Sequence, residues 1–474
     1  MSSRVLCFVS LLLCIFPAIA FALHLPLTLT HFDANDPSRD PYQILSYLAS
    51  SSLARAHHLK NPQITATATS DATTTTTTPL FSHSYGGYSI SLSFGTPPQI
   101  LPFVMDTGSD FVWFPCTHRY VCKNCSFSPS SDQNVTIPSF IPKLSSSSRL
   151  VGCRNPKCSW VHHTNKTQCD ECRNSFTPQN CTQACPPYFL LYGPGTTAGV
   201  ALSETLNLGD RTVSNFLVGC SIFSSRQPAG IAGFGRGLPS LPTQLKLHKF
   251  SYCLISRRFD DSPSSSTLIL DSTSDMDRKT NGLIYTPFIK NPIVRGKEAF
   301  QVYYYVGLRK ITVGGRRVKV PRKFLSPGKN GDGGTIVDSG STFTFMAHEI
   351  FEPLAVEFVK QVKNYSRARD VEVLTGLRPC FDVKDMGKPV ELPELRLHFK
   401  GGAEIALPLE NYFAVVGEGV ACLTVVTDGD VGGGKAVVGH SGPAVVLGSF
   451  QMQNYYVEYD LRNQRLGLKP QLCI

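Results

Sequence analysis

The stretch Val104-Met105-Asp106-Thr107-Gly108-Ser109 decides the fold, because the chain repeats it as Ile336-Val337-Asp338-Ser339-Gly340-Ser341. In both copies an apolar run, typical of a buried strand, leads into Asp-Thr/Ser-Gly-Ser. At ordinary composition an Asp-Thr/Ser-Gly triplet occurs by chance roughly once in a couple of thousand positions. Two copies in matching contexts therefore indicate a duplicated unit with one carboxylate in each half.

A second pair of matching segments supports the duplication. Gly230-Ile231-Ala232-Gly233 follows the first Asp segment, and Val445-Val446-Leu447-Gly448 follows the second. Each is a short apolar run that ends in glycine. Each half thus contains the same two features in the same order.

The two carboxylates point to hydrolysis by acid and base. Two carboxylates about one water apart can split a peptide bond, because one activates the water and the other protonates the leaving amine. Like charges that close cannot both ionise, so Asp106 and Asp338 would share a proton. The following glycine lets the backbone turn and present its N–H to the carboxylate. The alternative, that both aspartates are ordinary turn residues, fits their paired contexts poorly.

Length and composition favour a globular protein of two lobes. The chain has 474 residues, of which 42% are hydrophobic and 10% aromatic. From Tyr88 onward the pattern is mainly β, with period-two alternation over 88–94 and clear later strands over 302–308 and 455–460. One helix is predicted over 347–362. The polar stretch 264–280 marks the boundary, so we expect an N-terminal lobe over 81–272 and a C-terminal lobe over 273–474.

The N-terminal segment resembles a leader followed by a removable extension. Residues 1–22 have the charge, apolar core and small residues of a signal peptide. We expect residues 23–80 to be a propeptide with a helix over 42–60 and a Thr-rich linker over 65–78. Arg55 or Lys60 would pair with the two carboxylates in the precursor. The alternative is a disordered N-terminal extension.

The cysteines predict disulfide bonds. The sequence has 16 cysteines, and removal of the leader with Cys7 and Cys14 leaves an even number for an oxidising compartment. Their pairing is open, and a zinc site built on Cys122, Cys125, Cys169 and Cys172 is the less favoured alternative. Nine of them crowd a stretch over about 116–185 that would need covalent staples. The disulfide candidates are Cys116, Cys122, Cys125, Cys153, Cys158, Cys169, Cys172, Cys181, Cys185, Cys220, Cys253, Cys380, Cys422 and Cys473.

Glycosylation motifs and charge also fit the secretory route. Five Asn-x-Ser/Thr sequons are present, at Asn124, Asn134, Asn165, Asn180 and Asn364. The net charge of +10 comes from scattered basic residues, so we expect no nucleic-acid partner. The C-terminal residues carry neither an anchor signal nor a retention signal, so we expect no membrane anchor. Secretion to the extracellular space or cell wall is the predicted destination, with the vacuole as an alternative.

These segments together resemble the pepsin-like aspartic proteases, in which two Asp carboxylates are known to share one proton, and specifically the plant nepenthesin-like branch. The resemblance extends from about residue 85 to 473 and implies a mainly β, bilobal double-β-barrel fold with an active-site cleft between the lobes. The cysteine-rich insertion is similar to the one in that branch. Further matching segments are 95–99, 110–113, 233–237, 250–254 and 447–451.

The resemblance also implies roles for individual residues. Asp106 and Asp338 would be the catalytic pair, while the residues that support them would be Thr107, Gly108, Ser109, Ser339, Gly340 and Ser341. Tyr192 and Gly193 would form the tip of a flap that closes over substrate, with Trp113 as the partner of the tyrosine hydroxyl. Pro194 departs from the acidic residue usual at that position. The alternatives are a strand-end tyrosine and a core tryptophan.

The sequence thus predicts a secreted, monomeric aspartic endopeptidase made as a zymogen, which acts on polypeptides, needs no metal or cofactor and binds pepstatin-type inhibitors. Its main rival is a catalytically inactive binding protein of the same fold that inhibits cell-wall-degrading glycosidases. The complete pair of Asp segments favours the enzyme. A disulfide-rich receptor or lectin would not require them, and a dimeric enzyme of the retroviral kind needs only one per chain.

Overall fold

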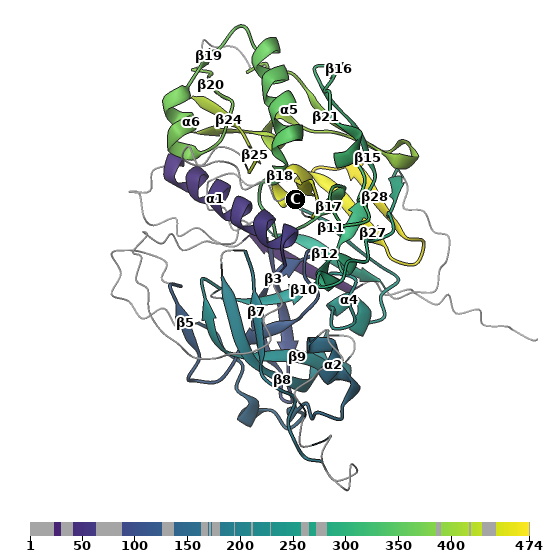
Figure 1. The fold of residues 1–474 in the computed structure, drawn as a ribbon. Helices are drawn as coiled ribbons and strands as arrows, with labels where there is room; N and C mark the ends of the chain where they lie inside the picture. Colours follow the sequence, from purple (N-terminus) through teal and green to yellow (C-terminus); the bar gives the residue numbers. More distant parts are fainter. Residues whose placement is uncertain are drawn as a thin grey trace, which may run out of the picture.

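The fold is seen in a computed structural model of the chain (Figure 1). It describes residues 23–29, 41–62, 88–125, 137–162, 169, 172, 181–193, 195–209, 212–227, 229–256, 265–271, 282–384, 390–416, 419–428 and 442–473. The predicted leader, the Thr-rich linker, Pro194 and the sequons at Asn134, Asn165 and Asn180 lie outside these residues.

A large sheet of 15 strands forms the centre of the molecule and contains strands from both ends of the chain. Thirteen of them follow one another in the order β13 (Ile284–Pro287), β28 (Arg465–Pro470), β27 (Tyr455–Asp460), β11 (Lys249–Cys253), β12 (Ser265–Asp271), β1 (Leu23–Leu29), β2 (Tyr88–Phe94), β3 (Gln99–Asp106), β10 (Gly230–Gly233), β4 (Trp113–Pro115), β9 (Thr212–Ser225), β8 (Thr196–Asn207) and β6 (Arg149–Leu150). The remaining two are β5 (Val121–Lys123), which pairs with β9, and β7 (Tyr188–Leu191), which pairs with β8.

Three smaller sheets complete the C-terminal half. The first carries the second Asp segment and has the order β14 (Tyr304–Val306), β17 (Thr335–Val337), β26 (Val445–Leu447), β18 (Thr344–Met346) and β25 (Val425–Val426). The second is β16 (Arg316–Arg317), β15 (Leu308–Val313), β21 (Leu395–Phe399) and β22 (Glu404–Ala406). The third is β19 (Ser366–Arg367), β20 (Cys380–Asp382), β24 (Val420–Leu423) and β23 (Phe413–Val416).

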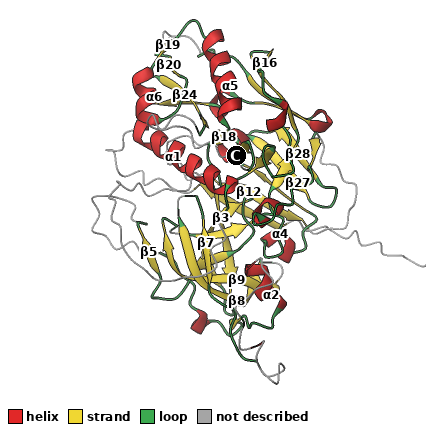
Figure 2. Cartoon of the chain, in the orientation of Figure 1, coloured by secondary structure: helices red, strands yellow, loops and turns green. Residues whose placement is uncertain are grey.

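Among the described residues three helices lie near one another, two of them at one end of the molecule and the third across its middle (Figure 2). These are α1 (Pro41–Lys60), α5 (His348–Gln361) and α6 (Arg369–Thr375), whereas α2 (Pro156–His162) and α4 (Leu241–Gln244) are short. The predicted helices over 42–60 and 347–362 are thus present as α1 and α5. In α5 the side chains of Ile350, Leu354 and Phe358, four residues apart, are buried as the pattern predicted. The short 3₁₀ helices of the described ranges are Pro142–Leu144, Glu298–Gln301, Arg322–Phe324, Lys400–Gly402, Leu409–Asn411 and Ser449–Met452.

The first strand was not predicted from the sequence. The backbone of β1 pairs with β12 over six positions and with β2 over three, so it fills a place inside the large sheet. The segment 23–80, which the sequence assigns to a propeptide, thus contributes a strand as well as α1. The lobe boundaries at 272 and 273 remain a prediction, since β11 and β12 pair in one sheet with β27 and β28.

All fourteen cysteines that follow the predicted leader form seven disulfides, as their even number predicted. The bonds join Cys116 to Cys220, Cys122 to Cys125, Cys153 to Cys169, Cys158 to Cys185, Cys172 to Cys181, Cys253 to Cys473 and Cys380 to Cys422. The four cysteines of the zinc alternative are therefore oxidised, which overturns that alternative because zinc binds thiolates. Five of the bonds lie within the cysteine-rich stretch or join it to β9.

Candidate active site

The two Asp segments end equivalent strands. Asp106 is the last residue of β3, and Asp338 directly follows β17. Each strand pairs in parallel with a short strand of its own half, β3 with β10, which ends at Gly233, and β17 with β26, which Gly448 follows. The backbone N–H of Phe234 donates to the Asp106 carbonyl over 2.7 Å, and that of Asp338 donates to the Leu447 carbonyl over 3.0 Å. The duplication inferred from the sequence is therefore a duplication of the supporting sheet.

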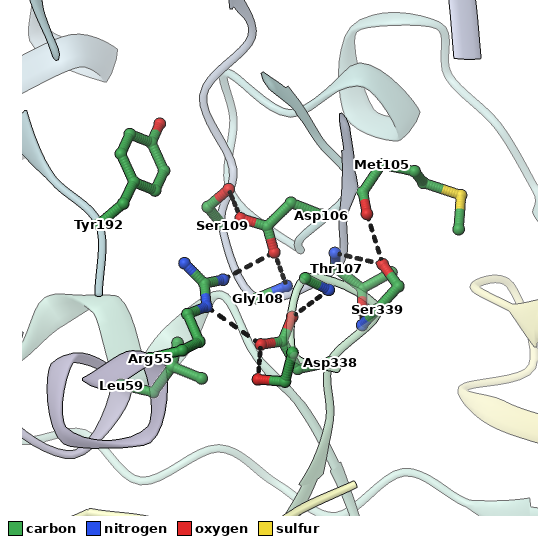
Figure 3. A network of polar contacts seen from close by, with 12 residues as sticks. Arg55, Leu59, Met105, Asp106, Thr107, Gly108, Ser109, Tyr192, Asp338 and Ser339 are labelled. Atoms are coloured by element: carbon green, nitrogen blue, oxygen red, sulfur yellow. Dashed lines mark hydrogen bonds and ion pairs between the residues drawn. The ribbon is translucent and has the colours of Figure 1, made fainter. Parts of the chain in front are cut away.

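The two loops hold each other through their hydroxyl residues. The Thr107 N–H donates to Ser339 Oγ over 3.1 Å, and the Ser339 N–H donates to Thr107 Oγ1 over 2.9 Å. Each hydroxyl then donates across to a carbonyl of the opposite strand, Thr107 to Val337 at 3.2 Å and Ser339 to Met105 at 2.8 Å. This buried reciprocal pattern fixes the two aspartates relative to one another (Figure 3).

Within each loop the carboxylate is held in the same way. Gly108 N–H donates to Asp106 Oδ1 and Gly340 N–H to Asp338 Oδ1, over 2.9 and 3.0 Å. Ser109 Oγ donates to Asp106 Oδ2 at 2.6 Å, and Ser341 Oγ donates to Asp338 Oδ2 at 2.7 Å. The six supporting residues predicted from the resemblance thus surround the two carboxylates.

The glycines of the two loops leave room for the carboxylate of the opposite half. A Cβ on Gly108 would lie 2.6 Å from Asp338 Oδ1, and a Cβ on Gly340 would lie 2.4 Å from Asp106 Oδ1. Each loop backbone therefore closely approaches the carboxylate of the other half. Any side chain at these positions would push the two aspartates apart.

Arg55 of α1 lies between the two carboxylates. Its Nη2 is 2.7 Å from Asp106 Oδ1, and its Nε is 3.2 Å from Asp338 Oδ2 (Figure 3). All three side chains are buried. The sequence left Arg55 and Lys60 as alternatives for this contact. Lys60 instead pairs with Asp428, at 2.6 Å, and lies over the Phe345 ring.

The electrostatics of the pair are unequal. Burial raises the pKa of the Asp106 carboxyl to about 6, although the Arg55 guanidinium acts to lower it. Burial also acts to raise the pKa of Asp338, but Arg55 and the hydrogen bond from Ser341 outweigh it and lower that pKa. Burial opposes the charge of Arg55 as well, yet the two carboxylates raise its pKa, so the guanidinium stays charged. The Arg55 guanidinium is therefore a buried positive charge that is held in place by the carboxylates of Asp106 and Asp338.

Further contacts fix α1 across the site. The Phe343 N–H donates to Ser52 Oγ over 3.0 Å, and the Tyr303 hydroxyl donates to the Leu59 carbonyl over 3.3 Å. The helix also packs against α6, β18 and β25, with Leu45, Leu48, Ala56 and Leu59 buried. Figure 1 shows α1 crossing between the strands β5 and β7 to β9 and the part that carries α5 and α6. Because Arg55, Ser52 and Leu59 are all engaged, α1 occupies the space in front of the carboxylates.

The residues predicted to form the flap lie beside α1, close to Arg55. Tyr192 follows β7, and its hydroxyl accepts a hydrogen bond of 2.9 Å from Trp113 Nε1. A Cβ on Gly193 would lie 2.3 Å from the Arg55 Cα, so the turn after Tyr192 touches the backbone of α1. The structure thus brings together the three residues expected at the flap, with Tyr192 bonded to Trp113 and Gly193 against α1.

A small cavity of about 30 Å³ adjoins Asp106. Its walls include Val104, Ile231, Tyr192 and Gln227, and α1 closes it with Ser51, Ser52 and Arg55. Sequence reasoning missed Gln227 and Ser52, because neither belongs to a motif that marks a site. Both lie beside the cavity through tertiary contacts that no local motif encodes.

Two further groups of residues lie away from this site. Asn124 and Asn364, the sequons within the described residues, are exposed, as an acceptor for glycan requires. Cys158, His162 and Cys185 lie within 4.8 Å of one another, but the two sulfurs are bonded to each other and are not thiolate ligands. In the part of the chain that is described, no helix is long and apolar enough to cross a membrane.

Comparison with known proteins identifies the family of the chain. Residues 88–270 match the family model described as xylanase inhibitor N-terminal, and residues 303–470 match its C-terminal counterpart. The chain is 33% identical to a probable aspartyl protease of Arabidopsis thaliana over 81% of this chain and 82% of that protein. It is 30% identical to the aspartic proteinase nepenthesin-1 of Nepenthes gracilis over 82% of this chain and 78% of that one.

Solved structures give the same fold. The crystal structure of edgp covers 81% of this chain and 92% of its own, with a TM-score of 0.60 and 22% identity. Basic 7S globulin from soybean covers 82% and 93%, with a TM-score of 0.55 and 20% identity. At these identities the likeness concerns the fold, and it confirms the mainly β, pepsin-like architecture. With the sequence relatives, it shows that this chain belongs to the plant pepsin-like aspartic proteases of the nepenthesin-like branch.

Proposed function

We propose that this protein is a secreted aspartic endopeptidase, made as an inactive precursor, that uses Asp106 and Asp338 to hydrolyse peptide bonds. The observation that carries the proposal is the complete and symmetric support of the two carboxylates. Each accepts the N–H of its loop glycine and the hydroxyl of its loop serine. A binding protein would have no need of this arrangement.

The chemistry follows from two carboxylates that share one proton. The ionised carboxylate takes a proton from the attacking water, and the protonated one donates to the substrate carbonyl oxygen. A proton then passes to the leaving amine as the C–N bond breaks. The flap at Tyr192 and Gly193 covers the substrate and excludes bulk water. Neither a metal nor a cofactor takes part in these steps.

The contact between Arg55 and the two carboxylates supports the precursor part of the proposal. While α1 is docked, the guanidinium occupies the position where water and the scissile bond must lie. Arg55 acts to lower the pKa of both carboxylates, and its attraction to them is lost once they are protonated, so this contribution to docking becomes weaker as the pH falls. Acid would therefore release the helix and open the cleft.

Seven disulfides support the secretory route, since such bonds persist in oxidising compartments. The substrate is a polypeptide, as it is for enzymes of this family, and the functional unit is a monomer because one chain carries both aspartates. The destination is the extracellular space or cell wall, with the vacuole as the alternative.

The test is cleavage of a denatured protein by the full chain after secretion and acid treatment, with and without pepstatin. Asp106→Asn is the matched control, because it keeps the shape of the side chain and removes its charge. We expect acid-dependent, pepstatin-sensitive cleavage that the variant lacks.

A folded, processed protein that cleaves nothing would contradict the proposal and favour the second candidate. That candidate is a binding protein that inhibits a cell-wall-degrading glycosidase. One observation favours it, namely that the family models matching both halves are described as xylanase inhibitor. Inhibition of a xylanase by the purified chain, without peptide cleavage, would establish it.

A further inference from the structure

Gln227 is a buried amide whose oxygen lacks a partner. It lies in the short connection between β9 and β10, directly before the strand that supports Asp106. Its side chain is 3% exposed, and its Oε1 has no hydrogen-bond partner among the described residues. A buried polar atom without a partner is costly, and such atoms in native proteins call for an explanation.

The surroundings of Gln227 suggest what the missing partner is. Gln227 lines the cavity beside Asp106, together with the apolar side chains of Val104 and Ile231. The other fixed polar groups of the cavity wall are already engaged. Asp106 is held by Gly108 and Ser109, and the Tyr192 hydroxyl by Trp113. Among the described lining residues, Gln227 alone presents a buried side-chain atom without a partner.

The position of Gln227 is fixed by the strand after the flap. A Cβ on Gly195 would lie 2.9 Å from Gln227 Cγ and 3.2 Å from its Nε2, so the absence of a side chain at Gly195 makes room for the amide. Packing of the stem against this backbone restricts the rotamers of Gln227. The amide is therefore an ordered part of the cavity wall.

Helix α1 closes this cavity only while it is docked. Ser51, Ser52 and Arg55 form its outer wall. If the helix leaves on activation, Val104, Ile231, Tyr192 and Gln227 face whatever occupies the cleft. A substrate side chain next to the scissile bond would then meet the apolar side chains of Val104 and Ile231 and the unpaired acceptor of Gln227.

We propose that Gln227 selects substrates whose side chain next to the scissile bond ends in an uncharged hydrogen-bond donor, a hydroxyl or an amide. This inference rests on the proposed protease function. An apolar side chain would leave Oε1 unpaired, whereas a donor satisfies it, and sites with a buried polar group reject analogues that lack the matching group. A charged side chain is disfavoured because its desolvation among Val104 and Ile231 is not offset by an amide.

Matched peptide substrates test the proposal. Two pairs of peptides would differ only in the residue next to the scissile bond, Tyr against Phe and Thr against Val. For the mature wild-type enzyme we expect kcat/KM to be about tenfold higher for the hydroxyl member of each pair, the size of one net hydrogen bond. Gln227→Met keeps the length of the side chain and removes the acceptor, so we expect the preference to disappear.

Two controls separate the subsite from folding. Gln227→Glu keeps an acceptor at the same position and should retain the preference for the hydroxyl substrates. Gln471→Leu changes an exposed glutamine near the C-terminus and should change nothing. Melting temperatures of all variants identify any loss of fold.

The outcomes distinguish this inference from the function on which it rests. Equal cleavage of both members by the wild type, or an unchanged preference in Gln227→Met, would overturn the role of Gln227 while leaving the protease function intact. Failure of the folded, processed wild type to cleave any peptide would instead overturn the protease function and the subsite with it.

Discussion

The two Asp loops have nearly the same hydrogen bonds but different electrostatics. Around Asp106 and Asp338 the glycine and serine contacts agree to within 0.1 Å, whereas the pKa of Asp106 is raised and that of Asp338 is lowered. The duplicated scaffold therefore does not set the difference. Arg55, which comes from outside both repeats, contacts both carboxylates with different nitrogens. Symmetric supports can thus hold an asymmetric charge distribution.

The largest expected effect comes from substitution of either aspartate of the symmetric pair. Asp106→Asn and Asp338→Asn should each reduce kcat/KM of the processed enzyme about 10³-fold, because each removes one partner of the acid–base pair. Steady-state hydrolysis of a peptide measures the loss. If one variant kept most of the activity, the two carboxylates would not act as a pair.

The substitution Arg55→Ala removes the cation that makes the electrostatics of the two carboxylates unequal. This variant should be processed at a pH about one unit higher than the wild type, since two buried carboxylates lose the charge that favours docking. Gel analysis of processing across a pH series measures the shift. The matched control is Lys60→Met, whose cation pairs with Asp428 and should have a smaller influence. Equal shifts for the two variants would remove the special role of Arg55.

The substitutions Thr107→Val and Ser339→Ala test the hydrogen bonds that join the two Asp loops. Each should lower the free energy of unfolding by about 1–3 kcal/mol, because each leaves a buried N–H and a buried carbonyl without their hydroxyl partner. Denaturant titration gives both values, and similar losses would confirm that the two hydroxyls are equivalent. Ser366→Ala removes an exposed hydroxyl and serves as the control.

The smallest effect concerns His58, whose pKa is lowered from 6.5 to about 4 by burial and by the nearby Arg55, against the attraction of Asp338. A histidine with a lower pKa in the docked state favours docking when it is neutral. Docking therefore weakens as the pH falls from about 6.5 to about 4. His58→Gln cannot gain that proton, so processing should require a slightly lower pH. A shift in the opposite direction would contradict the argument.

The sequence predicted those parts of the site that local motifs encode. Asp-Thr/Ser-Gly-Ser is a continuous stretch in which the turn, the N–H and the hydroxyl lie within four residues, so each carboxylate and its supports follow from the motif. The choice between Arg55 and Lys60 could not be made, because it depends on where the end of α1 lies against loops more than 50 residues away. The disulfide pairing and Gln227 depend on tertiary contacts in the same way.

The strand β1 was missed for a different reason. Its residues, Leu-His-Leu-Pro-Leu-Thr-Leu, alternate as a strand should, but they directly follow the predicted leader and precede a helical pattern. The segment was therefore interpreted only as part of a removable propeptide. Its pairing partners, β12 and β2, lie far along the chain, and no local signal points to them.

The place of β1 between β12 and β2 has a consequence for maturation. A cut in the connection after α1 would sever the backbone, yet the strand would still be hydrogen-bonded on both sides. The product of the cut is then a nicked, two-chain molecule rather than a shortened one. Complete loss of the segment would leave two open strand edges, on β12 and β2, in the middle of the sheet. Activation that removed the whole segment would therefore be a strand-exchange reaction as well as a proteolytic one.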